Sequence, residues 1–245
     1  MLSNIFNTIL YNPLFNGLIA LYNFIPGHDL GVAIIVLTIL IRFVLYPLSA
    51  KSLKAQREMQ KLQPELKKIQ DLHSGDAQAK QKAVMEFYKK NKINPMSSCL
   101  PLLIQFPILI ALYRVFITGL NGEKFDALYS FVPAPEHFSS MFFGVLDLSQ
   151  KNIFLAILAG ALQYLQSKML IKQKPNIQPV KKEAEKSNQP NFASMMNKQM
   201  LYFMPIFTVF IAASLPAGLA LYWVATTLFS IFQQIFLLRK EKANG

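Results

Sequence analysis

Forty consecutive residues near the end of the chain, from Gln199 to Leu238, include no charged side chain. A helix needs about 20 mostly apolar residues to cross the hydrocarbon core of a bilayer. The stretch is therefore long enough for two such helices, and Pro216-Ala217-Gly218 within it predicts a tight turn between them. Of all 245 residues, 53% are hydrophobic and only 16% are charged, which is too apolar for an ordinary soluble domain of this length. The sequence predicts an all-α, polytopic membrane protein.

Five segments are long and apolar enough to span a membrane. They are Leu30–Leu48, Cys99–Gly119, Ile153–Ile171, Gln199–Leu215 and Gly218–Leu238. We therefore predict five transmembrane helices.

The basic residues gather in three of the regions between and after these segments. Residues 49–98 contain eleven Lys or Arg against five Asp or Glu, residues 172–198 contain six against two, and the tail 239–245 contains three against one. Residues 120–152 contain two basic and four acidic residues, and residues 1–29 contain no Lys or Arg. The positive-inside rule makes the first three regions cytoplasmic and the other two extracytoplasmic. An outside amino terminus and a cytoplasmic carboxyl terminus require an odd number of spans, in agreement with five.

The regions outside the spans have their own patterns. Residues 1–29 predict an amphipathic helix lying on the outer membrane face; the alternative is a sixth span within Ile5–Ile25. Residues 49–98 predict a cytoplasmic helical hairpin, because helical periodicity continues on both sides of a turn signal at His73-Ser74-Gly75-Asp76. A solvated charged connector is the alternative there. Residues 120–152 predict an irregular loop, and the proline-containing residues 172–198 a mobile one.

Arg42 lies inside the first of the five apolar segments. A guanidinium keeps its charge, so within a membrane it must reach the interface or face protein and water. No Asp or Glu lies in any predicted span, so its partners must be water, backbone carbonyls or neutral polar groups. Thr38, Arg42, Tyr46 and Ser49 are spaced to share one face of a helix.

Neutral polar residues form further stripes on other predicted spans. In the last span they are Trp223, Thr226 or Thr227, Ser230, and Gln233 or Gln234; the third span adds Gln163 and Gln166, and the second adds Gln105. Such residues commonly hold helices together, at about 0.6 kcal/mol each. Three stripes together with an uncompensated arginine favour a wet cavity that attracts acidic groups. The candidate groove residues are Arg42, Thr38, Gln105, Gln163, Trp223, Thr226 and Ser230.

Catalytic and metal sites are not predicted. The chain has a single cysteine, Cys99, and its three histidines fall in three different regions. Neither a GxSxG nor an HExxH motif is present, and no paired carboxylates lie within the spans. We expect no catalytic residue, no metal and no cofactor, and a protein that is not an enzyme.

Several long motifs occur in a characteristic order. They are Ile41-Arg-Phe-Val-Leu-Tyr-Pro-Leu with Leu62-Gln-Pro, then Asn94-Pro with Cys99-Leu-Pro-Leu-Leu-Ile-Gln-Phe-Pro-Ile, then Phe203-Met-Pro and Leu215-Pro-Ala-Gly-Leu-Ala-Leu-Tyr-Trp. Through them the chain resembles the YidC-type membrane protein insertases from Tyr11 to Arg239.

The resemblance implies a fold and a function. It implies five core helices around a hydrophilic groove that is open to the cytoplasm and the lipid, with a cytoplasmic hairpin at Lys51–Lys92. The family's groove arginine maps onto Arg42, and other groove positions onto Gln163 and Trp223. We expect a compact form, without a large extracytoplasmic domain, in the bacterial cell (inner) membrane.

The implied activity is to receive nascent membrane segments and release them sideways into lipid. The implied partners are nascent membrane proteins, the ribosome and the lipid bilayer. The Sec translocon and the signal recognition machinery are left open, and no specific nucleic acid sequence is expected. The alternative function is a small-anion transporter with Arg42 as its binding site, although no internal repeat supports it.

Overall fold

The computed structural model describes residues 2–73, 75–92, 100–120, 127–171 and 199–243. The predicted loop 172–198, the Asn94-Pro motif and Cys99 lie outside these residues. The elements are α1 (Leu2–Phe6), the π-turn η1 (Asn7–Tyr11), α2 (Asn12–Phe24), α3 (Leu30–Val44), α4 (Tyr46–Lys61), α5 (Gln63–Leu72), α6 (Ala77–Lys90), α7 (Leu100–Leu120), β1 (Met141–Phe142), β2 (Leu146–Asp147), α8 (Ile153–Ile171), the π-turn η3 (Gln199–Phe203), α10 (Met204–Ser214) and α11 (Ala217–Ala243).

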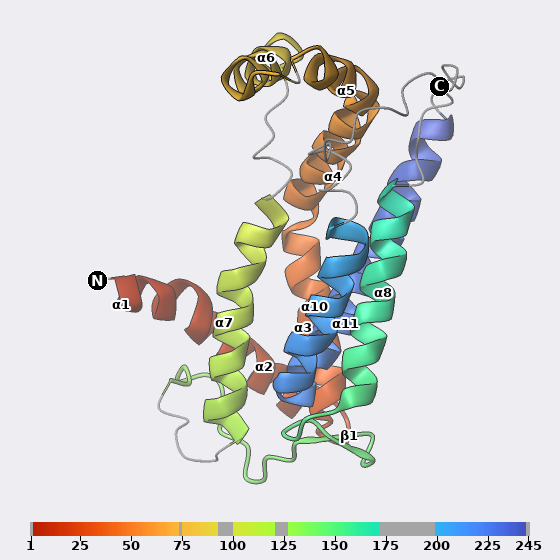
Figure 1. The fold of residues 1–245 in the computed structure, drawn as a ribbon. Coiled ribbons are helices and arrows are strands. Elements are labelled where there is room, and N and C mark those ends of the chain that lie inside the picture. Colours follow the sequence, from red (N-terminus) through yellow and green to blue (C-terminus); the bar gives the residue numbers. More distant parts are fainter. Residues whose placement is uncertain (1, 74, 93–99, 121–126, 172–198, 244–245) are drawn as a thin grey trace.

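A bundle of long helices forms the body of the molecule (Figure 1). Helix α11 contacts α3, α7, α8 and α10, and it also contacts α4. Helices α5 and α6 pack on each other at one end of the bundle, and the β1–β2 hairpin lies at the opposite end (Figure 1). Helix α11 is therefore the common support of the bundle.

Two of the described helices, α8 and α11, are long and apolar enough to cross a membrane. The α3–α4 pair makes a third if it is counted as one bent span. Helices α7 and α10 contain shorter apolar stretches, at Leu103–Ile117 and within Leu201–Ser214. The turn between α10 and α11 falls at Leu215 and Pro216, where the proline and glycine predict it. These helices are consistent with the predicted all-α membrane protein. The number of spans stays a prediction.

The first predicted span is not one straight helix. Helix α3 ends at Val44, α4 begins at Tyr46, and the two axes differ by 67°. Pro47 explains the break, because its ring removes a helical hydrogen bond and clashes with the preceding turn. The single helical face predicted for Thr38, Arg42, Tyr46 and Ser49 is thus interrupted after Arg42.

The amino-terminal helix is part of the protein core. The chain is helical from Leu2 to Phe24. The π-helical segment η1 lies between α1 and α2, just before Pro13 in the first turn of α2. The apolar face of α2 is buried against α3 and α7, with Phe15, Leu18 and Tyr22 at most 2% exposed. Residues 127–148 also pack over α2, so this side of the helix faces protein, and its position on the outer membrane face stays a prediction.

Polar side chains of α2 hold that loop through its backbone. The Asn16 Nδ2 donates to the Ala127 carbonyl at 2.8 Å, and the Tyr129 N–H donates to Asn16 Oδ1 at 2.6 Å. The Tyr22 hydroxyl accepts the Ser139 N–H at 2.8 Å. These bonds order part of a segment that we predicted to be irregular, and its last part forms the antiparallel β1–β2 pair.

Close contact between α8 and α10 depends on Gly160. A Cβ at this position would lie 2.2 Å from Val209 Cγ2 and 3.0 Å from the Pro205 carbonyl oxygen. Gly160→Ala is expected to lower stability by about 1–3 kcal/mol, because the added methyl forces the helices apart. Thermal unfolding in detergent measures this change.

Gly17→Ala is the matched control, because its Cβ would meet Leu37 Cδ1 at an ordinary 3.4 Å. It is expected to be neutral or to stabilise by up to ~1 kcal/mol through helix propensity. Equal effects of the two substitutions would contradict the close-contact explanation.

Candidate functional site

Arg42 lies in the last turn of α3 and is only partly exposed. Its Nη2 donates to Gln105 Oε1 of α7 at 3.2 Å. The helix that contains it has no other charged residue, and its hydrogen-bond partner comes from another helix. Sequence reasoning named both residues, and the structure brings them together.

A third helix completes this contact. The Gln105 Nε2 donates to the hydroxyl of Tyr222 on α11 at 2.9 Å, and Tyr222 is only 1% exposed. The amide of Gln105 thus accepts from the cation with its oxygen and donates to the tyrosine with its nitrogen. We call Arg42, Gln105 and Tyr222 the arginine cluster. It joins α3, α7 and α11.

The charge in this cluster has no acidic counterpart in the part of the chain that the structure describes. Among the described residues, Arg42 forms no ion pair. Gln105 and Tyr222 are neutral hydrogen-bonding groups. A charge with neutral partners in an apolar bundle remains available to a ligand of opposite sign.

Two predicted groove residues continue the line of Tyr222 along α11. Thr226 and Ser230 follow at intervals of four residues, which places them on the same helical face. Thr226 is buried, and the Ser230 hydroxyl donates to the Thr226 carbonyl at 2.9 Å. Trp223 lies on the neighbouring face and is partly exposed.

The other two predicted residues differ in their contacts. Thr38 is buried one turn before Arg42, and its hydroxyl donates to the Ile34 carbonyl of its own helix at 2.6 Å. Gln163 lies on α8 and is partly exposed. Within the described part of the chain, it forms no hydrogen bond to the arginine cluster. The grouping of Gln163 with Arg42 therefore stays a prediction.

Further polar contacts connect α4 to α11 beyond the bend. The Gln233 Nε2 donates to Ser49 Oγ at 2.8 Å and to the Tyr46 carbonyl at 3.3 Å. The Arg57 Nη2 donates to the Gln234 carbonyl at 3.3 Å, and Arg57 is buried. These contacts hold α4 in its bent position, and the same bend ends α3 just after Arg42.

Sequence reasoning missed Tyr222 and Arg57. Tyr222 precedes Trp223 and lies four residues before Thr226, so the period of the α11 stripe contained a usable signal. Arg57 belongs to the basic segment 49–98, where a solvated side chain is the normal expectation. Its burial results from the path of α4 along α11.

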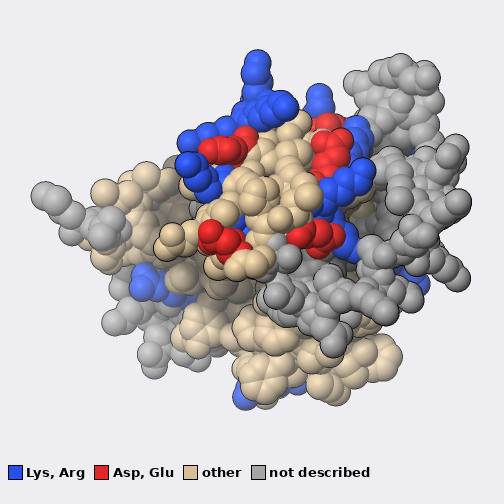
Figure 2. Space-filling model, turned by 45° about the horizontal axis from the view of Figure 1, so that its top comes forward, with Lys and Arg blue, Asp and Glu red and all other residues tan. Residues whose placement is uncertain are grey.

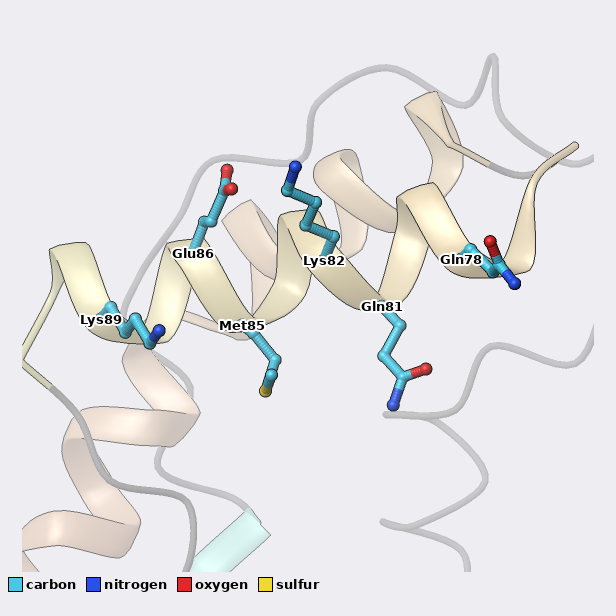
Figure 3. Close-up of a pocket in the computed structure, with 6 residues that line it drawn as sticks. All are labelled: Gln78, Gln81, Lys82, Met85, Glu86 and Lys89. Carbon is cyan, nitrogen blue, oxygen red and sulfur yellow. The ribbon is translucent and has the colours of Figure 1, made fainter.

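An open hollow lies elsewhere, along α6 (Figure 3). It has a volume of about 350 Å³ and is lined by Gln78, Gln81, Lys82, Met85, Glu86 and Lys89. All six residues belong to one exposed helix, so the described residues do not enclose a ligand there. We assign it no part in the Arg42 site.

Gln105→Leu tests the link between the three helices. It removes the hydrogen bonds of the amide to Arg42 and to Tyr222. The buried Tyr222 hydroxyl then lacks the donor that Gln105 supplies. We expect a loss of roughly 0.6–1.7 kcal/mol, the range for hydrogen bonds between membrane helices. A double-mutant cycle with Tyr222→Phe, read by thermal unfolding in detergent, measures the coupling.

Thr227→Val is the control for this cycle, because the Thr227 hydroxyl donates to the Trp223 carbonyl of its own helix at 2.9 Å. It should show no coupling to Gln105→Leu. Additive effects of Gln105→Leu and Tyr222→Phe would contradict the proposed link.

Comparison with known proteins agrees with the motifs of the sequence. The family described as "60Kd inner membrane protein" matches residues 20–244. Proteins named "Membrane protein insertase YidC" from Francisella tularensis subsp. novicida strain U112 and subsp. holarctica strain LVS are each 36% identical over 216 residues. These residues are 87% of this chain and 33% of each relative, so the chain spans about a third of the length of the curated relatives it matches. The match confirms the predicted resemblance, and the chain belongs to the 60Kd inner membrane protein family, that of the YidC-type insertases.

Proposed function

We propose that this protein inserts segments of nascent membrane proteins into the lipid bilayer and carries out no bond chemistry. The observation that carries the proposal is the arginine cluster: a guanidinium in an apolar helix, hydrogen-bonded to a neutral amide and unpaired with any described carboxylate. The insertase names of the relatives support the same activity.

The proposed site is a hydrophilic groove beside the arginine cluster. Its lining consists of Arg42, Thr38, Gln105, Gln163, Trp223, Thr226 and Ser230. A polar or acidic flank of a substrate enters the groove, where these groups replace part of its lost hydration. The apolar part of the substrate then moves sideways into lipid, and its burial drives insertion.

We further propose five spans, with the amino terminus outside and the carboxyl terminus in the cytoplasm of a bacterial cell. The candidates are α8 and α11, which are long and apolar enough to span, the bent α3–α4 pair, and the apolar helices α7 and α10. The distribution of basic residues supports this orientation.

The end that contains α5 and α6 faces the cytoplasm in this arrangement. Between Ser49 and Lys92 there are eleven basic and five acidic residues, and many of their side chains project from this end (Figure 2). We propose that this surface receives the ribosome and its nascent chain, because an excess of positive charge attracts polyanionic surfaces over long range. The Sec translocon and the signal recognition machinery are further candidate partners.

Charge reversal tests the role of Arg42. Arg42→Glu is expected to reduce insertion of a substrate with an acidic translocated flank by about tenfold, equivalent to ~1.4 kcal/mol. A neutral-flank version of the same substrate should be affected less. Protease protection after insertion into proteoliposomes measures both.

Arg114→Glu provides a matched charge reversal outside the arginine cluster, since Arg114 is exposed and bonds Asn7 at 3.4 Å. It should leave the ratio of the two substrates unchanged. Gln105→Glu keeps the arginine but places beside it a carboxylate that offsets its positive charge, so it should also reduce insertion of the acidic-flank substrate. Normal insertion of the acidic substrate by Arg42→Glu would refute the charge mechanism.

Photocrosslinking tests the route of the substrate. A photoreactive amino acid at Trp223 or Gln163 should crosslink to a ribosome-stalled membrane segment several times more strongly than one at Phe210, because groove positions contact the segment before release. Phe210 on α10 is 72% exposed and is the control that we expect to face lipid. Equal yields at the three positions would argue against the groove.

A further inference from the structure

The β1–β2 hairpin has an unusual turn. The Val145 N–H donates to the Phe142 carbonyl at 3.1 Å, which closes a turn with Phe143 and Gly144 at its centre. Both central residues have positive φ, 50° at Phe143 and 67° at Gly144. Turns of this kind favour Asn or Asp followed by Gly, because a bulky side chain is strained at positive φ. Phenylalanine is an unfavourable choice for the first position.

The side chains at this turn are also unusually exposed. Phe143 is 71% exposed and Val145 is 86% exposed. No residue from Met141 to Leu146 is charged. The backbone of the turn is strained at Phe143, and the turn exposes the apolar side chains of Phe143 and Val145. Exposed apolar side chains of this kind indicate a surface that contacts an apolar partner.

The base of the hairpin is fixed to the start of α3. The Asp29 carboxylate accepts the Phe143 N–H, and it also caps α3 by accepting the Val32 N–H at 2.9 Å. The Phe142 ring covers Gly31 so closely that a Cβ there would lie 2.1 Å from a ring carbon. The hairpin therefore has a set direction relative to α3.

Hydrogen bonds to Asp147 hold the second strand. Its carboxylate accepts from Ser140 Oγ at 2.7 Å and from the Ser149 N–H and Oγ at 2.9 and 2.6 Å. These bonds lower the pKa of Asp147. The base of the hairpin is polar and well bonded, whereas its tip is apolar and exposed among the described residues.

The tip lies where the apolar surface of the bundle begins. The chain continues from the hairpin into α8, whose first residues, Ile153 and Phe154, are 61% and 80% exposed. The intervening residues join the start of α11, through the Ala217 N–H to the Gln150 carbonyl at 2.7 Å. The hairpin therefore lies at the level where α3, α8 and α11 start (Figure 1).

We propose that Phe143 and Val145 insert into the lipid bilayer and anchor the extracytoplasmic end of the bundle at the boundary of headgroups and acyl chains. Lipid is the occupant that the structure favours, because the tip lies at the end of the bundle where α8, a helix long and apolar enough to span a membrane, begins with the exposed Ile153 and Phe154. The absence of charge along Met141–Leu146 agrees with this environment. The proposal does not depend on the groove or on the substrate.

Depth-dependent fluorescence quenching tests the anchor. Val145→Cys in a Cys99→Ser background is labelled with an environment-sensitive fluorophore and placed in vesicles of phosphatidylcholine and phosphatidylglycerol. We expect quenching by lipid with a nitroxide at acyl carbon 5 that is at least about threefold greater than for Glu136→Cys, an exposed position in the same loop. Iodide in the water should quench the Glu136→Cys label more strongly. Equal lipid and iodide quenching at the two positions would overturn the proposal and indicate an aqueous surface.

Phe143→Asn separates the anchor from the folding of the turn. Asparagine tolerates positive φ and keeps the N–H that Asp29 accepts, so this variant should unfold in detergent at the same temperature or a higher one. In vesicles it should reduce lipid quenching at Val145→Cys to about half or less, whereas Phe143→Trp should preserve it. Unchanged lipid quenching in Phe143→Asn would exclude Phe143 as an anchor.

Discussion

A permanent charge inside an apolar helix is the constraint on which the rest of the structure depends. Placing an arginine in a membrane helix is costly, up to about 2.5–3.5 kcal/mol at the helix centre on insertion scales, and Arg42 lies in the last turn of α3. Arg42 has no described carboxylate to offset this cost, so the fold supplies Gln105 from α7 and, through it, Tyr222 from α11. The three helices must meet at this depth for the arginine to be tolerated. The same uncompensated charge is what we propose attracts a substrate.

Helix α11 makes this convergence possible because it is supported at both ends. At its first residues, backbone bonds from Ala217 and Gly218 dock the segment before α8. Near its other end, Gln233 and the Gln234 carbonyl hold α4 after the bend at Leu45. The bend ends α3 just beyond Arg42, so the position of the arginine is coupled to that of α4.

The helices themselves were largely predictable. The apolar segment Ile153–Ile171 coincides with α8, and the Pro216-Ala217-Gly218 signal marks the turn before α11, because both depend on local composition. The bend at Leu45 was less accessible, since a proline can either break a helix or only kink it. The burial of α2 was missed because an apolar helical face looks the same whether lipid or protein covers it.

The sequence by itself determined that the chain enters a membrane, that Arg42 has no acidic partner within the predicted spans, and which residues share a helical face. Hydropathy, charge and a period of 3.6 residues are properties of a single segment. The tertiary structure alone decided that Gln105 and Tyr222 are the groups around Arg42, that Arg57 is buried, and that Gln163 makes no hydrogen bond to the arginine cluster. Those facts depend on the rotation and depth of one helix against another, which packing between distant segments sets and no local pattern specifies.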